Sequence, residues 1–185
     1  MNFSRIITLR ENKIIPLIKE ISIIFSFALL TGIGAKIKIE IGPVPITMQT
    51  VPVLLSGALL GSKKGAFSQI LYLLLGLFGI SWFSRGGGLL YIFSPTFGYI
   101  IGFVLCAYFV GFLFEKGFYR NVWKIFFTII TGNLLIYIPG LLWLIKFVGI
   151  ENILKSGFYP FIFGDFLKSI LVASTLMIKK NVLKK

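Results

Sequence analysis

The chain has 185 residues, of which 57% are hydrophobic, 16% aromatic and 14% charged, and this balance indicates an integral membrane protein with one transmembrane domain over residues 1–185. The net charge of +13 does not indicate a partner nucleic acid, because the basic residues cluster between apolar segments instead of on a soluble face. Without histidine and with only six acidic residues, the chain lacks the side chains for a zinc site or histidine-based catalysis, so we expect no metal, no cofactor and no enzymatic activity.

Apolar segments separated by short polar or glycine-rich connections predict an all-α membrane fold of six transmembrane helices. The predicted spans are residues 14–35, 48–60, 66–83, 95–114, 125–145 and 158–178. Pro139 and Gly140 predict a kink or break inside the fifth span. Most of the 19 Lys and Arg residues fall on one side of this arrangement, which predicts that both termini are cytoplasmic.

Small residues recur at helical spacing in the first span, at Ala28, Gly32 and Ala35. In lipid, such a stripe lets another backbone approach closely. We predict that it is a docking surface for a partner protein, while packing against another helix of the same chain is nearly as well supported.

The connection after the third span contains three successive glycines, Gly86, Gly87 and Gly88. Glycine places little steric limit on the backbone, so this loop is expected to act as a lid over a ligand.

Asp165 and Lys168 lie inside the last span, where an ionisable residue costs roughly 2.5–3.5 kcal/mol on insertion scales. Their i, i+3 spacing places them on one face of a helix, where they pair with each other or bind the same ligand. The alternative is a buried ion pair that only fastens two helices together.

The predicted topology brings a carboxylate, an ammonium, an amide, a phenol and a guanidinium to the outer side of the membrane, beside abundant Phe and Leu. Such a set suits a small ligand with an apolar body, a polar head and an acid group. Taken singly, the uncharged members are better explained by hydrogen bonds between helices, and Arg85 by a solvated loop charge. The candidate ligand-binding residues are Asp165, Lys168, Gln49, Tyr99, Thr47 and Arg85.

Several short motifs, in this order, resemble the BioY biotin transporter family. They are Gly42-Pro43-Val44-Pro45-Ile46-Thr47-Met48-Gln49, Ser94-Pro95-Thr96-Phe97-Gly98-Tyr99 and Gly164-Asp165-Phe166-Leu167-Lys168, with weaker glycine motifs between them. Ile80-Ser81-Trp82 and Phe97 depart from the usual pattern of the family.

This resemblance implies a substrate-capture S component of an energy-coupling factor transporter, in the cell membrane of a prokaryote. Its implied partners are biotin, a separate transmembrane coupling protein, which would dock on the small-residue stripe, and two ATPases. It also implies that Asp165 accepts hydrogen bonds from the ureido group of biotin and that Lys168 reaches the ureido carbonyl or neutralises Asp165.

Three alternatives remain open from the sequence. The same architecture serves another vitamin, such as riboflavin or thiamine. A membrane enzyme of lipid metabolism is less well supported, because one intramembrane Asp without His is too little for metal or phosphoryl chemistry. A purely structural subunit would not need a glycine-rich loop over a charged pocket.

Overall fold

The computed structural model describes the backbone of residues 3–182 and the side-chain surroundings of residues 14–178. Within this range, the helices of more than ten residues correspond one to one with the predicted spans. They are α1 (Phe3–Lys36), α2 (Thr50–Leu60), α3 (Ser62–Leu77), α4 (Phe97–Glu115), α5 (Val122–Val148) and α7 (Tyr159–Val182). Short elements connect them: β1 (Lys38–Ile39), β2 (Ile46–Thr47), the 3-10 helices η1 (Leu89–Phe93) and η2 (Phe118–Arg120), and α6 (Ile153–Gly157).

Four segments of the described chain form helices long and apolar enough to cross a membrane. They are Ile14–Lys36, Phe97–Glu115, Val122–Val148 and Ile153–Ile178. The second predicted span is much shorter, because α2 has 11 residues and is only about 17 Å long. It is buried among its neighbours along one side, which suits a short helix that does not cross the bilayer unaided.

The third helix differs from its predicted span, since α3 begins at Ser62 and ends at Leu77 instead of Phe83. Gly79 adopts φ +112°, a conformation that favours glycine, and the chain turns back there. The amide of Gly88 donates to the carbonyl of Gly76 at 2.7 Å, so the returning loop is fastened to the end of α3.

Of the kink or break predicted in the fifth span, a break does not occur, since α5 continues as one helix through Pro139 to Val148. Neighbouring α4 packs closely on this part of α5. A Cβ atom at Gly102 would lie 2.6 Å from the Ile136 carbonyl oxygen, and one at Gly140 would lie 2.6 Å from the ring of Tyr99. Small residues therefore bring α4 and α5 together beside the proline.

The prediction that Ala28, Gly32 and Ala35 form a docking surface is wrong for this structure, because all three are buried inside the chain. Trp82 covers Gly32, where a Cβ atom would lie 3.1 Å from the Trp82 side chain. The same face of α1 is joined to α3 by a hydrogen bond from the Thr31 hydroxyl to Gln69 Oε1 at 3.3 Å. The stripe is thus an internal helix contact, which was the alternative interpretation.

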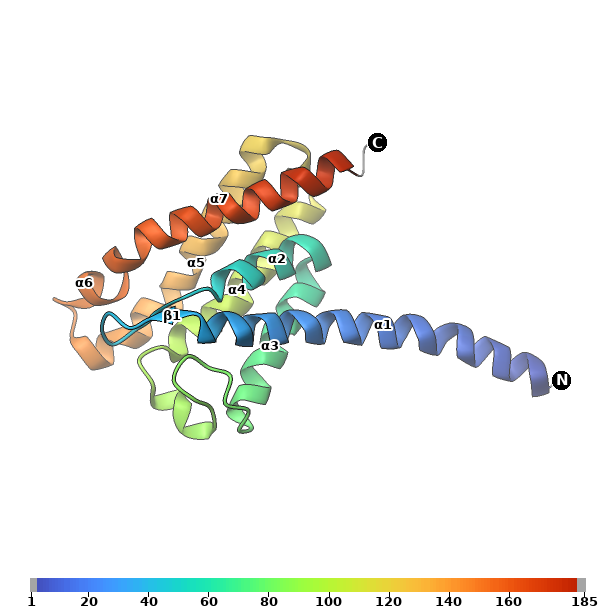
Figure 1. Cartoon of the computed structure of the whole chain (residues 1–185), viewed down its shortest axis with the longest axis horizontal. Coiled ribbons are helices and arrows are strands. Elements are labelled where there is room, and N and C mark those ends of the chain that lie inside the picture. The colour runs from blue at the N-terminus through green and yellow to red at the C-terminus, as the bar shows by residue number, and fades with distance from the viewer. Residues whose placement is uncertain (1–2, 183–185) are drawn as a thin grey trace.

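The two ends of the bundle differ in structure (Figure 1). The first residues of α1 extend beyond the other helices towards one end, where α7 also finishes, while β1 and α6 lie at the opposite end. Strands β1 and β2 pair there as a short antiparallel hairpin, with Lys38 opposite Thr47. This hairpin and the loop of residues 78–96 surround the cavity described next.

Candidate ligand-binding site

A cavity with about 520 Å³ of empty space, part of it open to the outside, lies at the end of the bundle that carries the hairpin. Its wall comes from the hairpin, the loop before η1, η1 itself and helices α2, α4, α5 and α7. Apolar and aromatic side chains make up much of it, and its polar or charged members are Thr47, Gln49, Thr50, Ser84, Tyr91, Thr96, Tyr99, Tyr137, Asp165 and Lys168.

Asp165 and Lys168 are paired at the α7 side of this cavity. Lys168 Nζ lies 2.9 Å from Asp165 Oδ1. Both residues are buried, since Asp165 is 8% exposed and Lys168 is 7% exposed. Pro160 is the second residue of α7, in the first turn, where its missing N–H is harmless, and the pair follows within three turns. The shared helix face predicted from the i, i+3 spacing is confirmed.

Tyr137 completes this charged group and was missed by the sequence analysis. Its hydroxyl donates to Oδ2 of Asp165, the oxygen that Lys168 does not contact. One turn earlier on α5, the side-chain amide of Asn133 approaches the Asp165 carbonyl at 3.5 Å. The signal was available, because polar residues four apart in an apolar span share a helix face that turns inward.

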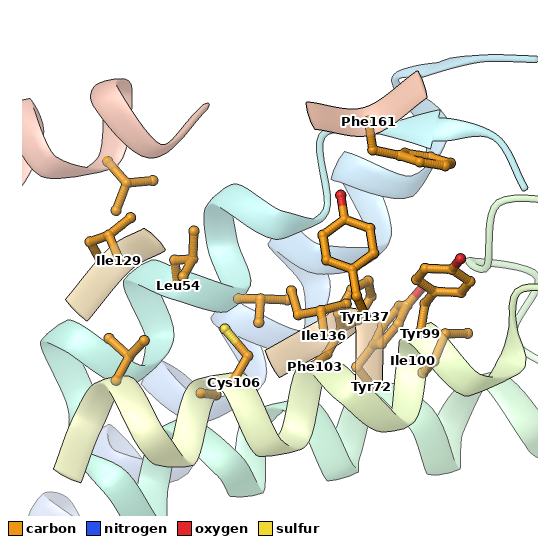
Figure 2. Close-up of a cluster of buried hydrophobic side chains, with 14 of the residues drawn as sticks. Leu54, Tyr72, Tyr99, Ile100, Phe103, Cys106, Ile129, Ile136, Tyr137 and Phe161 are labelled. Atoms are coloured by element: carbon orange, nitrogen blue, oxygen red, sulfur yellow. The ribbon is translucent and has the colours of Figure 1, made fainter. Parts of the chain in front are cut away.

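Aromatic rings from three helices meet beside the pair (Figure 2). Tyr99 of α4, Tyr137 of α5 and Phe161 of α7 have ring centroids 6.1 to 6.4 Å apart. The Tyr99 hydroxyl donates to the Gly157 carbonyl at 2.8 Å, so it fastens α4 to α6, while its ring lines the cavity. The rings offer an apolar surface next to a carboxylate and an ammonium.

Gln49 and Thr47 line the cavity, but their polar atoms already bond inside the protein. Gln49 Nε2 donates to the Tyr72 hydroxyl at 2.8 Å, and the Thr47 hydroxyl donates to Gln49 Oε1 at 2.9 Å. Their side-chain bonds fit the structural interpretation, in which they hold the start of α2. Thr50 differs from them, because its buried hydroxyl has no hydrogen-bond partner within the described chain.

Comparison with known proteins identifies the family. A family model described as "BioY family" matches residues 7–185. The chain belongs to the BioY family. A "Probable biotin transporter BioY" from Pyrococcus horikoshii is 40% identical over 152 residues, which cover 82% of this chain and 90% of that protein. The "Biotin transporter BioY" from Thermotoga maritima is 36% identical over 149 residues, covering 80% of this chain and 87% of that one.

A solved structure supports the same fold. The chain aligns with a crystal structure described as the S-component for biotin from an ECF-type ABC transporter, with a TM-score of 0.78 and 24% identity. The alignment covers 90% of this chain and 93% of that one. The six-helix arrangement is therefore the S-component fold.

Arg85, unlike the other candidate residues of this BioY-family chain, does not line the cavity. Its Nη2 lies 2.5 Å from Glu40 Oε2 and 2.7 Å from the Gly42 carbonyl oxygen, and its Nη1 donates to the Pro43 carbonyl at 2.9 Å. Lys38 contacts Glu40 as well, at 2.7 Å. The hydrogen bond from Arg85, followed by that from Lys38, lowers the pKa of Glu40 from 4.5 to about 2.

The glycine segment forms a tight turn in this structure. Phe83 and Gly86 exchange backbone hydrogen bonds of 2.9 and 3.4 Å, and Gly86 and Gly88 have φ of +123° and +92°. Gly87 packs against the backbone of Ile80. Motion of this loop as a lid remains a prediction, and the turn needs its glycines in either case.

Residues 84–96 contribute further polar groups that the sequence analysis did not single out. The Tyr91 hydroxyl is hydrogen-bonded with Ser84 Oγ at 3.0 Å and accepts from Thr96 Oγ1 at 2.8 Å. All three residues line the cavity. In the part of the chain that the structure describes, no group of three or more acidic, cysteine or histidine residues is placed to hold a metal ion.

Proposed function

We propose that this chain is the biotin-binding S component of an energy-coupling factor transporter. The observation that carries the proposal is the buried Asp165–Lys168 pair on the wall of a cavity of about 520 Å³, in a chain of the BioY family. The names of the relatives, all given as biotin transporters, support the choice of ligand.

The chemistry of the wall suits the three parts of biotin. The ureido head has N–H donors and a carbonyl, so an N–H group matches the Asp165 carboxylate as acceptor and the carbonyl matches the Lys168 ammonium as donor. The sulfur-containing ring is apolar and fits the rings of Tyr99 and Phe161. The valerate chain then extends towards the rim, where Arg85 is the candidate partner for its carboxylate.

The chain is proposed to act in the plasma membrane of a prokaryote, with its termini in the cytoplasm. The excess of Lys and Arg in the tails and in the turns near residues 63–64 and 116–124 supports that orientation. The sequence carries no phosphate-binding loop of the G-x-x-x-x-G-K-[ST] type, so ATP hydrolysis is assigned to two separate ATPases that act through a transmembrane coupling protein.

Binding of labelled biotin to the purified protein in lipid nanodiscs tests the proposal, with riboflavin and thiamine as competitors. Saturable binding that unlabelled biotin alone displaces is the expected result. Asp165→Asn should weaken it, while Glu151→Gln, which changes an exposed acid in the α5–α6 connection, is the matched control. Displacement by another vitamin, or the absence of biotin binding to folded protein, would overturn the assignment.

A further inference from the structure

Tyr137 is the one side chain of α5 that bonds to the Asp165 carboxylate in the described structure. We propose that Tyr137 is a positioning residue, which fixes Asp165 so that its carboxylate offers a free acceptor site to a ureido N–H donor of the ligand. This inference rests on the proposed binding of biotin and concerns how the site selects its ligand.

The acceptor capacity of Asp165 carries the first step. A carboxylate has about four lone-pair sites, two on each oxygen. Among the described residues, Oδ2 accepts from the Tyr137 hydroxyl and Oδ1 from Lys168 Nζ at 2.9 Å. About two sites remain, one on each oxygen, and a single one suffices for an N–H group of a cyclic urea, whose two N–H groups point away from each other.

The position of the Tyr137 hydroxyl is fixed by packing. The residue is 7% exposed, and its ring meets Phe158 edge to face with centroids 4.9 Å apart. Figure 2 shows the Tyr137 hydroxyl rising from α5 towards the segment of α7 that carries Phe161. A ring held in this way sets the direction of its hydroxyl before the ligand arrives, which is how a preorganised site gains selectivity.

A second cavity shows what the hydroxyl prevents. About 500 Å³ of space, open to the outside of the bundle, lies between α5 and α7, and both Tyr137 and Asp165 line it as well as the first cavity. Asn133 and Ser169 form its polar part, one turn away along α5 and α7. Without the Tyr137 hydroxyl, the carboxylate has room and polar partners on that side, so it can turn away from the ligand.

A positioning role of Tyr137 and a mere packing role predict different ligand selectivities, so the test measures relative affinities for several ligands. The test compares biotin with a derivative in which both ureido nitrogens carry methyl groups, and with desthiobiotin, which keeps both N–H groups. The wild-type protein should bind biotin and desthiobiotin at least about tenfold more tightly than the methylated derivative, because that derivative leaves a buried acceptor site unpaired.

Tyr137→Phe removes the hydroxyl and keeps the ring. Its affinity for biotin and desthiobiotin should fall about tenfold to a hundredfold, while its affinity for the methylated derivative changes much less. The selectivity ratio, which is the affinity for biotin divided by that for the methylated derivative, therefore falls. Tyr108→Phe is the control, because Tyr108 is 51% exposed on α4 and does not line either cavity. Equal losses for all ligands, or none, would overturn the positioning role.

A second replacement keeps the inference testable if Tyr137→Phe does not fold. Para-aminophenylalanine at position 137 retains a ring donor and should keep most of the selectivity ratio of the wild type. Loss of the ratio in this folded variant counts against the inference. Failure of the wild-type protein to bind biotin is a different result, which would remove the proposed function itself.

Discussion

Arg85 and Glu40, 45 residues apart in the sequence, form an ion pair of 2.5 Å that joins the two loops covering the cavity. The same guanidinium donates to the carbonyls of Gly42 and Pro43, and Lys38 adds a bond of 2.7 Å to the Ser84 carbonyl. These contacts connect the hairpin loop to the turn of residues 83–86. Charged contacts therefore hold the two loops together.

Arg85→Gln should increase the dissociation rate of biotin, because it removes the charge that holds the two loops together. Spin labels in the hairpin loop and beside Gly86 should report a broader distance distribution in the variant, and a shorter distance in the wild type when biotin is added. An unchanged distribution in both proteins would count against the lid. Biotinamide separates this role from contact with the valerate: if Arg85 also binds the ligand carboxylate, the variant loses affinity for biotin but not for biotinamide.

The contact between Glu40 and Arg85 predicts that the joining of the two loops depends on pH. Because the pKa of Glu40 is lowered from 4.5 to about 2, its stabilisation of the loops is fully present above pH 4.5 and is lost as the pH falls through about 2. NMR titration of the Glu40 carboxyl measures this directly. In Arg85→Gln the pKa should move back towards 4.5, and since the group is exposed, added salt should do the same. A pKa near 4.5 for Glu40 in the wild-type protein would show that its contact with Arg85 does not form in solution.

Disruption of the Asp165–Lys168 pair should affect both folding and binding. Asp165→Asn and Lys168→Ala each leave a buried charge without its partner, which costs about 3–5 kcal/mol when a buried pair is broken. We expect biotin affinity to fall at least about tenfold in each, measured by equilibrium dialysis on protein that elutes as the folded species. Folded variants that bind biotin like the wild type would make the pair a purely structural contact.

The part of the site that depends on local spacing was predictable, and the part that depends on tertiary contacts was not. Asp165 and Lys168 are three residues apart on one helix, so their pairing follows from helical geometry. The bond from Tyr137 to Asp165 spans 28 positions and that from Gln49 to Tyr72 spans 23. The spacing of Asn133 and Tyr137 indicates which face of α5 turns inward, but no pattern within one helix identifies the partner on another helix.

The fold was likewise predictable where it depends on local sequence and not where it depends on tertiary contacts. Six apolar segments predicted six helices, yet periodicity could not show which face of α1 is covered. The stripe of small residues at Ala28, Gly32 and Ala35 is compatible with any close neighbour. In the structure that neighbour includes Trp82, which comes from a loop some 50 positions later in the chain and packs on Gly32. The end of α3 was also misplaced, since Phe78 to Phe83 is apolar enough to continue a span but contains the turn at Gly79.

Gly32→Leu should destabilise the folded protein by about 1–3 kcal/mol, because a larger side chain meets Trp82 in a closely packed contact. Biotin binding should weaken with it, since the loop that follows Trp82 borders the cavity through Ser84. Ile33→Leu, at the exposed neighbouring position, is the control and should leave thermal unfolding unchanged. Normal stability of Gly32→Leu with loss of partner binding would restore the docking interpretation.

Thr50 offers a test of ligand contact that does not disturb any hydrogen bond of the empty protein. Its hydroxyl is buried at the first residue of α2, lines the cavity and has no partner in the described chain. A buried polar group without a partner is costly, and the cost is removed when a ligand supplies the missing bond. Thr50→Val keeps the shape and deletes the hydroxyl, so the empty protein should be as stable as the wild type or more so, while biotin affinity falls about tenfold, as measured by thermal unfolding and equilibrium dialysis. Lower stability of the empty variant would mean that the hydroxyl is already bonded within the protein, and unchanged affinity would exclude Thr50 from the contacts to biotin.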